Sequence, residues 1–114
     1  MTDYLAELEA YVRYCFEART ALRVDELASR LHMHPSALSR GFKSRTGQRL
    51  ARTLKDLQLS EAKRLLATTS LPTRDVASRA GFGTPNTLFR LFRTRLGVTP
   101  ESYRRRVVKR GSPS

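Results

Sequence analysis

Two basic segments, fifty residues apart, carry the side chains best suited to binding a polyanion. Residues 38–47 and 88–97 align in register, and both contain a leucine, an arginine, a phenylalanine, a further basic residue, a second arginine and a closing glycine. The forked guanidinium group of arginine can contact phosphates or the edge of guanine. The repeat therefore predicts two contacts with one extended polyanion, and DNA is the leading candidate.

The net charge of the chain agrees with this chemistry. Lys and Arg number 22 against 10 Asp and Glu, which leaves a net charge of +12. The first 20 residues are net acidic, so the positive charge lies in the rest of the chain. Such a field concentrates polyanions without conferring a sequence preference. Taken alone, the charge could also be explained as a highly charged surface that keeps the protein in solution.

Catalysis, metal binding and membrane insertion find little support in the sequence. No Ser/His/Asp set, carboxylate pair or glycine-rich phosphate loop is evident, so we expect neither an enzyme nor a cofactor. His32 and His34 have no third metal ligand close in sequence, and Cys15 has no partner for a disulfide. No segment has the ~18 apolar residues of a membrane span, and the chain does not open on a signal-peptide pattern. These features predict a cytoplasmic protein that is associated with the nucleoid when bound to DNA.

The helical periodicity of the chain predicts how the basic segments are positioned. Apolar residues recur every three or four positions without strand-like alternation, so the expected fold is all-α with seven helices. Thr84 and Pro85 are expected to begin the second basic helix, and Gly47 and Gly97 to end the two basic helices. The expected helices cover about residues 3–18, 24–31, 35–45, 48–67, 73–80, 85–95 and 100–109, and residues 111–114 are expected to form a disordered tail.

Residues 24–45 and 73–95 each show the pattern of a short helix, a tight turn and a basic helix. This is the helix-turn-helix arrangement, in which the second helix enters the major groove of DNA. With the leucine and phenylalanine of each repeat turned inward, helical geometry points a different set of side chains outward. In the first unit Ser36, Arg40 and Lys43 point outward and Ser39 lies on the flank; in the second, Asn86, Arg90 and Arg93 point outward and Phe89 lies on the flank.

Arg40 and Arg90 are the leading candidates for base contact. An exposed arginine on an amphipathic helix is usually just solvated, but these two recur at equivalent positions in a strongly basic chain. Arginine can form two hydrogen bonds to guanine, as asparagine can to adenine. Side chains farther along each helix, and a hydroxyl at a helix start, are better placed for phosphate. The phosphate candidates are Lys43, Arg45, Thr84, Arg93 and Arg95.

Three motifs in the second half of the chain resemble the DNA-binding domain of the AraC/XylS family of bacterial transcription regulators. They are Ala-Ser-Arg-Ala-Gly-Phe at 77–82, Leu-Phe-Arg-Leu-Phe-Arg at 88–93 and Gly-Val-Thr-Pro-Glu-Ser-Tyr-Arg at 97–104. Residues 59–66 also look like the family's linker helix. The resemblance covers about residues 3–106.

This resemblance implies a single DNA-binding domain over residues 1–110, built from two homeodomain-like lobes and a linker helix. The lobes cover about residues 3–47 and 70–108, and the linker helix covers about residues 48–67. The recognition helices, at about 35–45 and 85–95, enter successive major-groove segments roughly 34 Å apart. The family's base-contacting positions fall here on Ser36, Ser39, Arg40, Asn86, Thr87, Phe89 and Arg90.

The expected function is that of a sequence-specific transcription regulator that binds double-stranded DNA. Because the outward side chains differ between the two recognition helices, the expected site is asymmetric, roughly 20 base pairs long and bound by a monomer. The resemblance further implies an activator that acts beside RNA polymerase. Met1 and a complete first helix favour a stand-alone regulator over the excised DNA-binding half of a larger, ligand-responsive one. Two competing functions are a nonspecific architectural DNA-binding protein and a protein–protein module docked through the acidic first helix.

Four departures from the family pattern predict local consequences. His32 and His34 stand at a turn where glycine and a serine cap are common, and loss of a cap costs about 1 kcal/mol. Gly41 lies inside the first recognition helix, where it is expected to leave Phe42 loosely packed. The other two departures are Gln58, in place of a common arginine, and Phe89, in place of a small polar residue. We therefore expect the first lobe to be the less stable one and to complete its folding on DNA.

Overall fold

The computed structural model describes residues 3–109, and this span contains seven α-helices and no strand. The expected all-α fold is therefore confirmed, and each expected helix is present with its ends shifted by at most two residues. The tail expected at residues 111–114 lies outside the described residues. The helices are α1 (Tyr4–Ala18), α2 (Val24–Arg30), α3 (Pro35–Thr46), α4 (Leu50–Thr68), α5 (Thr73–Arg79), α6 (Pro85–Leu96) and α7 (Pro100–Lys109).

Caps and glycines set the ends of the two basic helices, α3 and α6. Both are 12 residues long, begin at a proline and end at the expected glycine, which is left-handed with φ of 76° after α3 and 71° after α6. The Thr84 hydroxyl accepts a hydrogen bond from the Thr87 amide at 3.4 Å, so the expected cap of α6 is formed. At α3 the cap is His34, whose Nδ1 accepts from the Ser36 amide at 3.1 Å. The expected loss of this cap is wrong, because an imidazole nitrogen supplies the acceptor.

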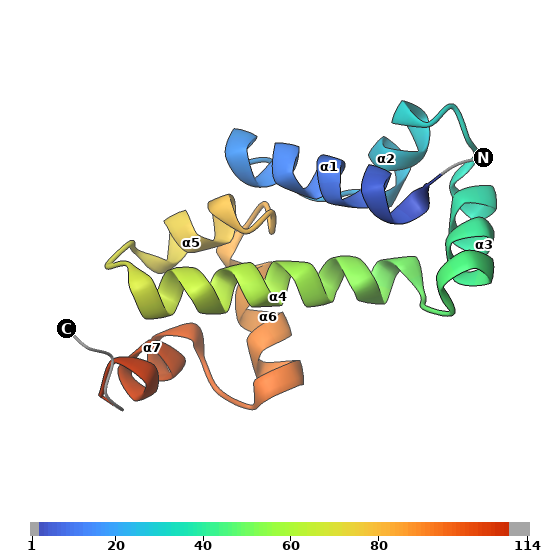
Figure 1. Ribbon diagram of the computed structural model, residues 1–114. Coiled ribbons are helices and arrows are strands. Elements are labelled where there is room, and N and C mark those ends of the chain that lie inside the picture. The colour runs from blue at the N-terminus through green and yellow to red at the C-terminus, as the bar shows by residue number, and fades with distance from the viewer. Residues whose placement is uncertain (1–2, 110–114) are drawn as a thin grey trace.

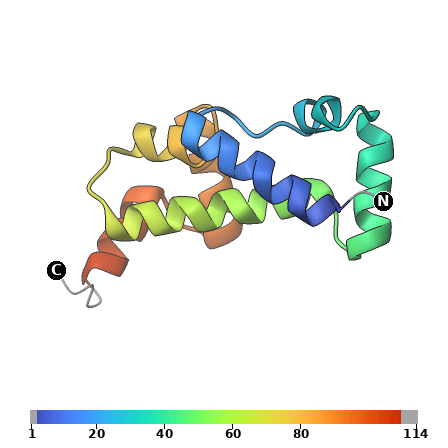
Figure 2. The same ribbon diagram turned by 45° about the horizontal axis from the view of Figure 1, so that its top comes forward.

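The long helix α4 forms the axis of the molecule (Figure 1). Its 19 residues extend about 28 Å at the usual helical rise. In this view α1, α2 and α5 lie on one side of α4, α6 and α7 lie on the other, and α3 crosses the end at which α4 begins. A second view shows α1 running over α4 (Figure 2). The molecule is elongated, with extents of 46 × 26 × 25 Å.

Two hydrophobic cores lie along successive halves of α4. Leu50 and Leu54 pack with α1, α2 and α3 around Phe42, which is 1% exposed. Farther along α4, Ala62 and Leu66 pack with α5 and α6 around Phe92, which is 0% exposed. The expectation that Phe42 is loosely packed is therefore wrong. Both recognition helices are anchored to α4 by an equivalent buried phenylalanine.

Gly41 makes room for a side chain of α1. A Cβ atom at Gly41 would lie 2.8 Å from Cζ of Tyr4 and closer still to its hydroxyl oxygen. Tyr4 is partly buried and packs against the first core. The glycine lowers the helix propensity of α3, but it also lets α1 pack closely against this helix.

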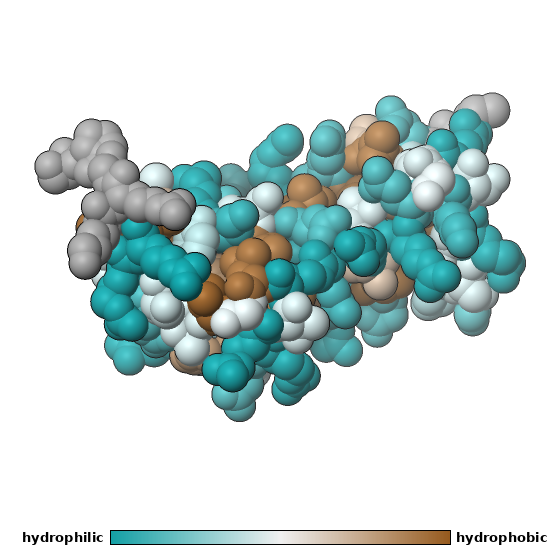
Figure 3. All heavy atoms as spheres, turned by 90° about the horizontal axis from the view of Figure 1, so that it is seen from below, coloured by the Kyte–Doolittle hydropathy of each residue, from teal (hydrophilic) through white to brown (hydrophobic). Residues whose placement is uncertain are grey.

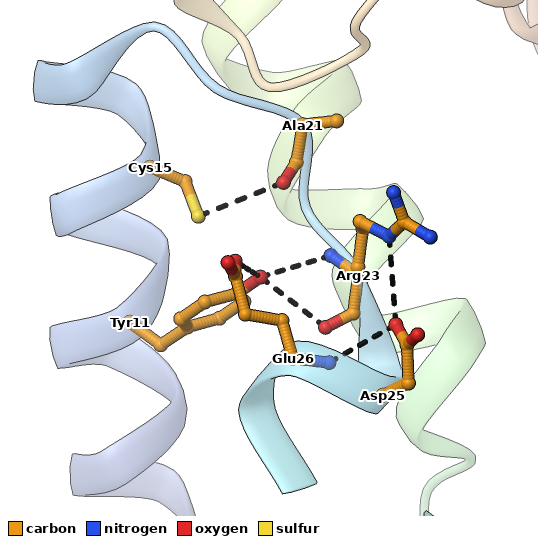
Figure 4. A network of polar contacts seen from close by, with 6 residues as sticks. All are labelled: Tyr11, Cys15, Ala21, Arg23, Asp25 and Glu26. Atoms are coloured by element: carbon orange, nitrogen blue, oxygen red, sulfur yellow. Dashed lines mark hydrogen bonds and ion pairs between the residues drawn. The ribbon is translucent and has the colours of Figure 1, made fainter. Parts of the chain in front are cut away.

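A buried hydroxyl group joins α1 to the start of α2 (Figure 4). The Tyr11 hydroxyl donates to Oε1 of Glu26 at 2.6 Å and accepts from the Arg23 amide at 3.0 Å. Burial, together with the hydrogen bond to Glu26, raises the pKa of Tyr11 well above its usual range. One turn farther along α1, the buried Cys15 thiol contacts the Ala21 carbonyl at 3.9 Å, and burial raises the pKa of this thiol as well. These contacts hold the first helix-turn-helix unit against α1.

The two halves of the molecule also contact each other directly at Gly81, which follows α5. Its carbonyl oxygen accepts hydrogen bonds from the Leu22 amide at 2.9 Å and from Nε2 of Gln58 at 2.6 Å. Gly81 has a φ of +77°, and a Cβ atom there would lie 3.1 Å from Cγ of Leu22, so both the backbone conformation and the space favour glycine. Gln58 is 8% exposed, which accounts for an uncharged amide at this position. The relative orientation of the two halves is therefore held by these contacts as well as by α4.

Candidate nucleic-acid interface

The exposed faces of α3 and α6 carry the side chains that were predicted to contact bases. Leu38 and Phe42 of α3 are buried, as are Leu88 and Phe92 of α6, so the predicted inward residues are confirmed. The predicted base contacts Ser36, Ser39, Arg40, Asn86, Thr87 and Arg90 are exposed, and Phe89 is half-buried. The two helices therefore share a buried frame and differ in what they expose.

The first turn of each recognition helix contains a hydrogen-bonded pair of side chains. The Ser36 hydroxyl lies 2.8 Å from Nδ1 of His34, and the Thr84 and Thr87 hydroxyls lie 3.1 Å apart. A hydroxyl group can both donate and accept, so each of these side chains keeps further hydrogen-bonding capacity for DNA. The capping contacts hold these hydroxyls in place at the helix starts.

Arg95 differs from the other predicted phosphate contacts because it already has an anionic partner. Its Nη1 atom lies 2.7 Å from Oδ1 of Asp56 on α4, and its side chain is 23% exposed. A phosphate must compete with this carboxylate for the guanidinium group. The other predicted phosphate contacts, Lys43, Arg45, Thr84 and Arg93, are exposed.

A groove of about 560 Å³ lies between α4 and α6. Thr87, Arg90 and Arg95 line its α6 side. Its α4 side contains three cationic residues that were not predicted to take part in binding, namely Arg49, Arg52 and Lys55. The spacing of residues 51, 52, 55 and 58, all of which line the groove, places them on one face of a helix. This spacing was the signal in the sequence that could have identified the groove.

The face shown in Figure 3 is mainly hydrophilic, with hydrophobic residues in separate patches. Within residues 3–109 the exposed large hydrophobic side chains are Leu5, Tyr14 and Val108, and none of them belongs to α3 or α6. A polar, cationic surface of this kind is typical of protein–DNA interfaces.

Neither a metal centre nor a membrane span occurs in the part of the chain that the structure describes. No three His, Cys, Asp or Glu side chains in residues 3–109 gather closely enough to hold a metal ion. No helix in this span is both long enough and apolar enough to cross a bilayer.

A family model described as a helix-turn-helix domain matches residues 27–106, which is most of the chain and covers all of the second helix-turn-helix unit and all but the first three residues of the first. The chain belongs to the AraC-type helix-turn-helix family. The resemblance expected from the three sequence motifs is thereby confirmed. Members of this family are DNA-binding domains of transcription regulators and not enzymes.

Solved AraC-type domains have the same fold. The DNA-binding domain of the global transcriptional factor AdpA, crystallised in complex with a target DNA, matches with a TM-score of 0.80 and 32% identity, covering 99% of this chain and 100% of that one. The C-terminal domain of the two-component response regulator yesN from Fusobacterium nucleatum matches with a TM-score of 0.71 and 25% identity, covering 85% of this chain and 97% of that one.

The curated relatives are longer proteins. The HTH-type transcriptional regulator Rv1931c of Mycobacterium tuberculosis is 35% identical over 85 residues, or 75% of this chain and 33% of that protein. The HTH-type transcriptional activator RhaR of Yersinia pseudotuberculosis is 32% identical over 73 residues, or 64% of this chain and 25% of that protein. The chain thus spans about a third or less of the length of these two relatives.

Proposed function

We propose that this AraC-type chain regulates transcription by binding a specific double-stranded DNA site through α3 and α6. The observation that carries the proposal is the pair of recognition helices, equal in length and in buried frame but unlike in their exposed side chains. The likeness of this chain to a domain solved with a target DNA supports the same function. The proposed base contacts are Ser36, Ser39, Arg40, Asn86, Thr87, Phe89 and Arg90.

In the proposed complex, α3 and α6 enter successive major-groove segments and read different bases. Arg40 and Arg90 each suit guanine, Asn86 suits adenine, and the ring of Phe89 suits a thymine methyl group. The phosphate contacts proposed at Lys43, Arg45, Thr84, Arg93 and Arg95 set the register without reading sequence. Because the exposed sets differ, one monomer binds an asymmetric site.

We further propose that binding activates transcription. The relatives include the activator RhaR, which supports activation rather than repression. An activator bound beside a promoter works by contacting RNA polymerase, so the polymerase is the proposed protein partner and the cytoplasmic nucleoid the proposed location. Both a stand-alone regulator and the DNA-binding part of a larger one fit this proposal.

The test is to select binding sites from a pool of random DNA duplexes with the purified chain. We expect a non-palindromic motif made of two blocks whose centres lie about 10 base pairs apart, because each block fills one major-groove segment. An architectural protein that coats DNA enriches no motif. A selection that ends without a motif would refute the proposal in favour of an architectural role.

Single arginine variants then assign the two blocks. Arg40→Ala and Arg90→Ala should each relax base preference in one block and weaken binding to the selected site by about 1–3 kcal/mol. Arg13→Ala is the matched control, because Arg13 is exposed on α1 and its substitution removes the same charge. Equal weakening of all three variants on every sequence would show that Arg40 and Arg90 do not contact bases.

A further inference from the structure

We propose that the groove between α4 and α6 binds the DNA backbone at the centre of the site, and that Arg49, Arg52 and Lys55 contact its phosphates. The first half of α4 is then a third DNA-binding element, beside the two recognition helices. This inference rests on the proposed binding of double-stranded DNA. It assigns a role to residues that neither the repeat nor the helix-turn-helix pattern singles out.

The position of the groove supports this role. α3 ends at Thr46 and α4 begins at Leu50, so the cations of α4 follow directly after the first recognition helix. The opposite wall of the groove belongs to the second recognition helix, α6. The groove lies between α6 and residues 49–58, and Figure 1 shows that this first half of α4 is the half nearest α3. A duplex that places two successive major-groove segments on α3 and α6 must pass its intervening backbone across this part of α4.

The charges of the groove are available for an anion. Among its five cations, Arg95 is held by Asp56 at 2.7 Å, and Arg90 is proposed to contact a base. The remaining three, Arg49, Arg52 and Lys55, are exposed, and their side chains form no ion pair with any residue between 3 and 109. The nearest carboxylate on α4, Asp56, is already occupied by Arg95. Three unpaired cations along one groove wall raise the local concentration of phosphates.

The shape and lining of the groove suit a sugar–phosphate chain. Its lining combines the apolar residues Ala51, Phe82 and Leu91 with cationic side chains from α4 and α6. Ala51 is small, so it leaves space between the longer side chains on either side. A DNA strand alternates apolar deoxyribose faces with anionic phosphates, so it offers complementary groups to both parts of the groove.

The proposed contact is independent of base identity, and its contribution should depend on salt. Each phosphate contact contributes about −0.9 to the slope of log K against log salt concentration. Loss of one contact therefore lowers affinity about fivefold at 0.15 M salt, and the loss disappears as the salt concentration approaches 1 M. Base preference in both blocks of the motif should stay unchanged, since the groove cations read no base edges.

The experiment measures this slope for the selected duplex with the wild-type chain and with Arg52→Gln, Lys55→Gln and the control Arg13→Gln. All three residues are exposed on helices, so helix content by circular dichroism should be equal among the variants. We expect the slope to fall in magnitude by about 0.9 for each groove variant and to stay at the wild-type value for the control. Equal slopes for groove and control variants would overturn the inference while leaving sequence-specific binding intact. Failure of the wild-type chain to bind any duplex would overturn both proposals.

Uncharged phosphate analogues can show where on the DNA the proposed contact lies. A methylphosphonate replaces one phosphate at a time across the selected duplex. Binding is measured at 0.15 M salt with the wild-type chain and with the double variant of Arg52→Gln and Lys55→Gln. We expect replacements between the two motif blocks to weaken binding by the wild-type chain about fivefold, and to weaken binding by the double variant of Arg52→Gln and Lys55→Gln clearly less, because that variant keeps only Arg49 of the three groove cations. If central replacements weaken both proteins equally, these side chains do not touch the central backbone, and the inference is wrong.

Discussion

Gly41 and Tyr4 provide a quantitative test of how α1 packs on the first recognition helix. A Cβ atom added at position 41 would lie 2.8 Å from Cζ and 3.2 Å from Cε2 of Tyr4, both well inside van der Waals contact. Gly41→Ala therefore has two opposing effects on the free energy of unfolding. The higher helix propensity of alanine stabilises α3, and the displaced Tyr4 ring destabilises the contact with α1.

The two effects can be separated by their magnitudes. Glycine in the interior of a helix is less favourable than alanine by about 0.5–1 kcal/mol. An extra methyl group in a packed contact costs about 1–3 kcal/mol. In the wild-type background we therefore expect Gly41→Ala to destabilise the chain by about 1 kcal/mol, the difference between these two values. In a Tyr4→Ala background the clash is absent, and the same change should stabilise it by about 0.5–1 kcal/mol.

The measurement is urea denaturation of the four proteins in this double-mutant cycle, at one pH and one temperature. We expect Gly41→Ala to lower the free energy of unfolding in the wild-type background and to raise it in the Tyr4→Ala background. The dependence of the unfolding free energy on urea concentration should be unchanged. If Gly41→Ala stabilises both backgrounds by the same amount, Tyr4 does not occupy the space beside Gly41. The account of why glycine is present in α3 would then be refuted.

Three further predictions concern the first lobe. His34→Ala should lower the free energy of unfolding by about 1 kcal/mol, whereas His34→Ser, which keeps an acceptor for the Ser36 amide, should lower it much less; equal losses in urea denaturation would contradict a capping role. Tyr11→Phe should lower the free energy of unfolding by about 1 kcal/mol at neutral pH, because it removes the hydrogen bonds of the hydroxyl group. Because folding raises the pKa of Tyr11, the stabilisation by this hydroxyl is complete below the unfolded pKa of about 10 and is lost as pH rises above it. In alkaline titrations the variant should therefore lose less stability than the wild type. The Cys15 thiol, which is 0% exposed, should react with a disulfide reagent only after unfolding, and rapid labelling of the folded chain would show that the first core is open.

The helices and their exposed faces were predictable because they depend on residues close together in the chain. The Thr84 cap, the glycine ends of α3 and α6 and the buried leucine and phenylalanine of each repeat all follow from short-range pattern and stereochemistry. The cap at His34 was missed because histidine is not among the usual capping residues.

The contacts that arrange these helices could not be predicted in the same way. Arg95 and Asp56 are 39 residues apart, and Gln58 and Gly81 are 23 apart, so no local pattern pairs them. Periodicity showed that Arg95 lies on a basic helix, but it could not show that a carboxylate on α4 already holds its guanidinium group. The departure of Gln58 from the common arginine was a sequence signal for a special contact, and its partner became identifiable only in three dimensions.

The shared helix α4 and the Gly81 contact have a consequence for recombining specificities between related regulators. The first half of α4 belongs to one core and the second half to the other, so a chimaera should be joined between Leu54 and Leu59. Gln58 and Gly81 must then come from the same parent, and the segment around Leu22 must match them, because all three meet at one carbonyl oxygen. Under the proposed function, transplanting a recognition helix alone is expected to change the bases that are contacted. Exchanging a whole half without its partners at this oxygen is expected to alter the distance between the two proposed DNA contacts.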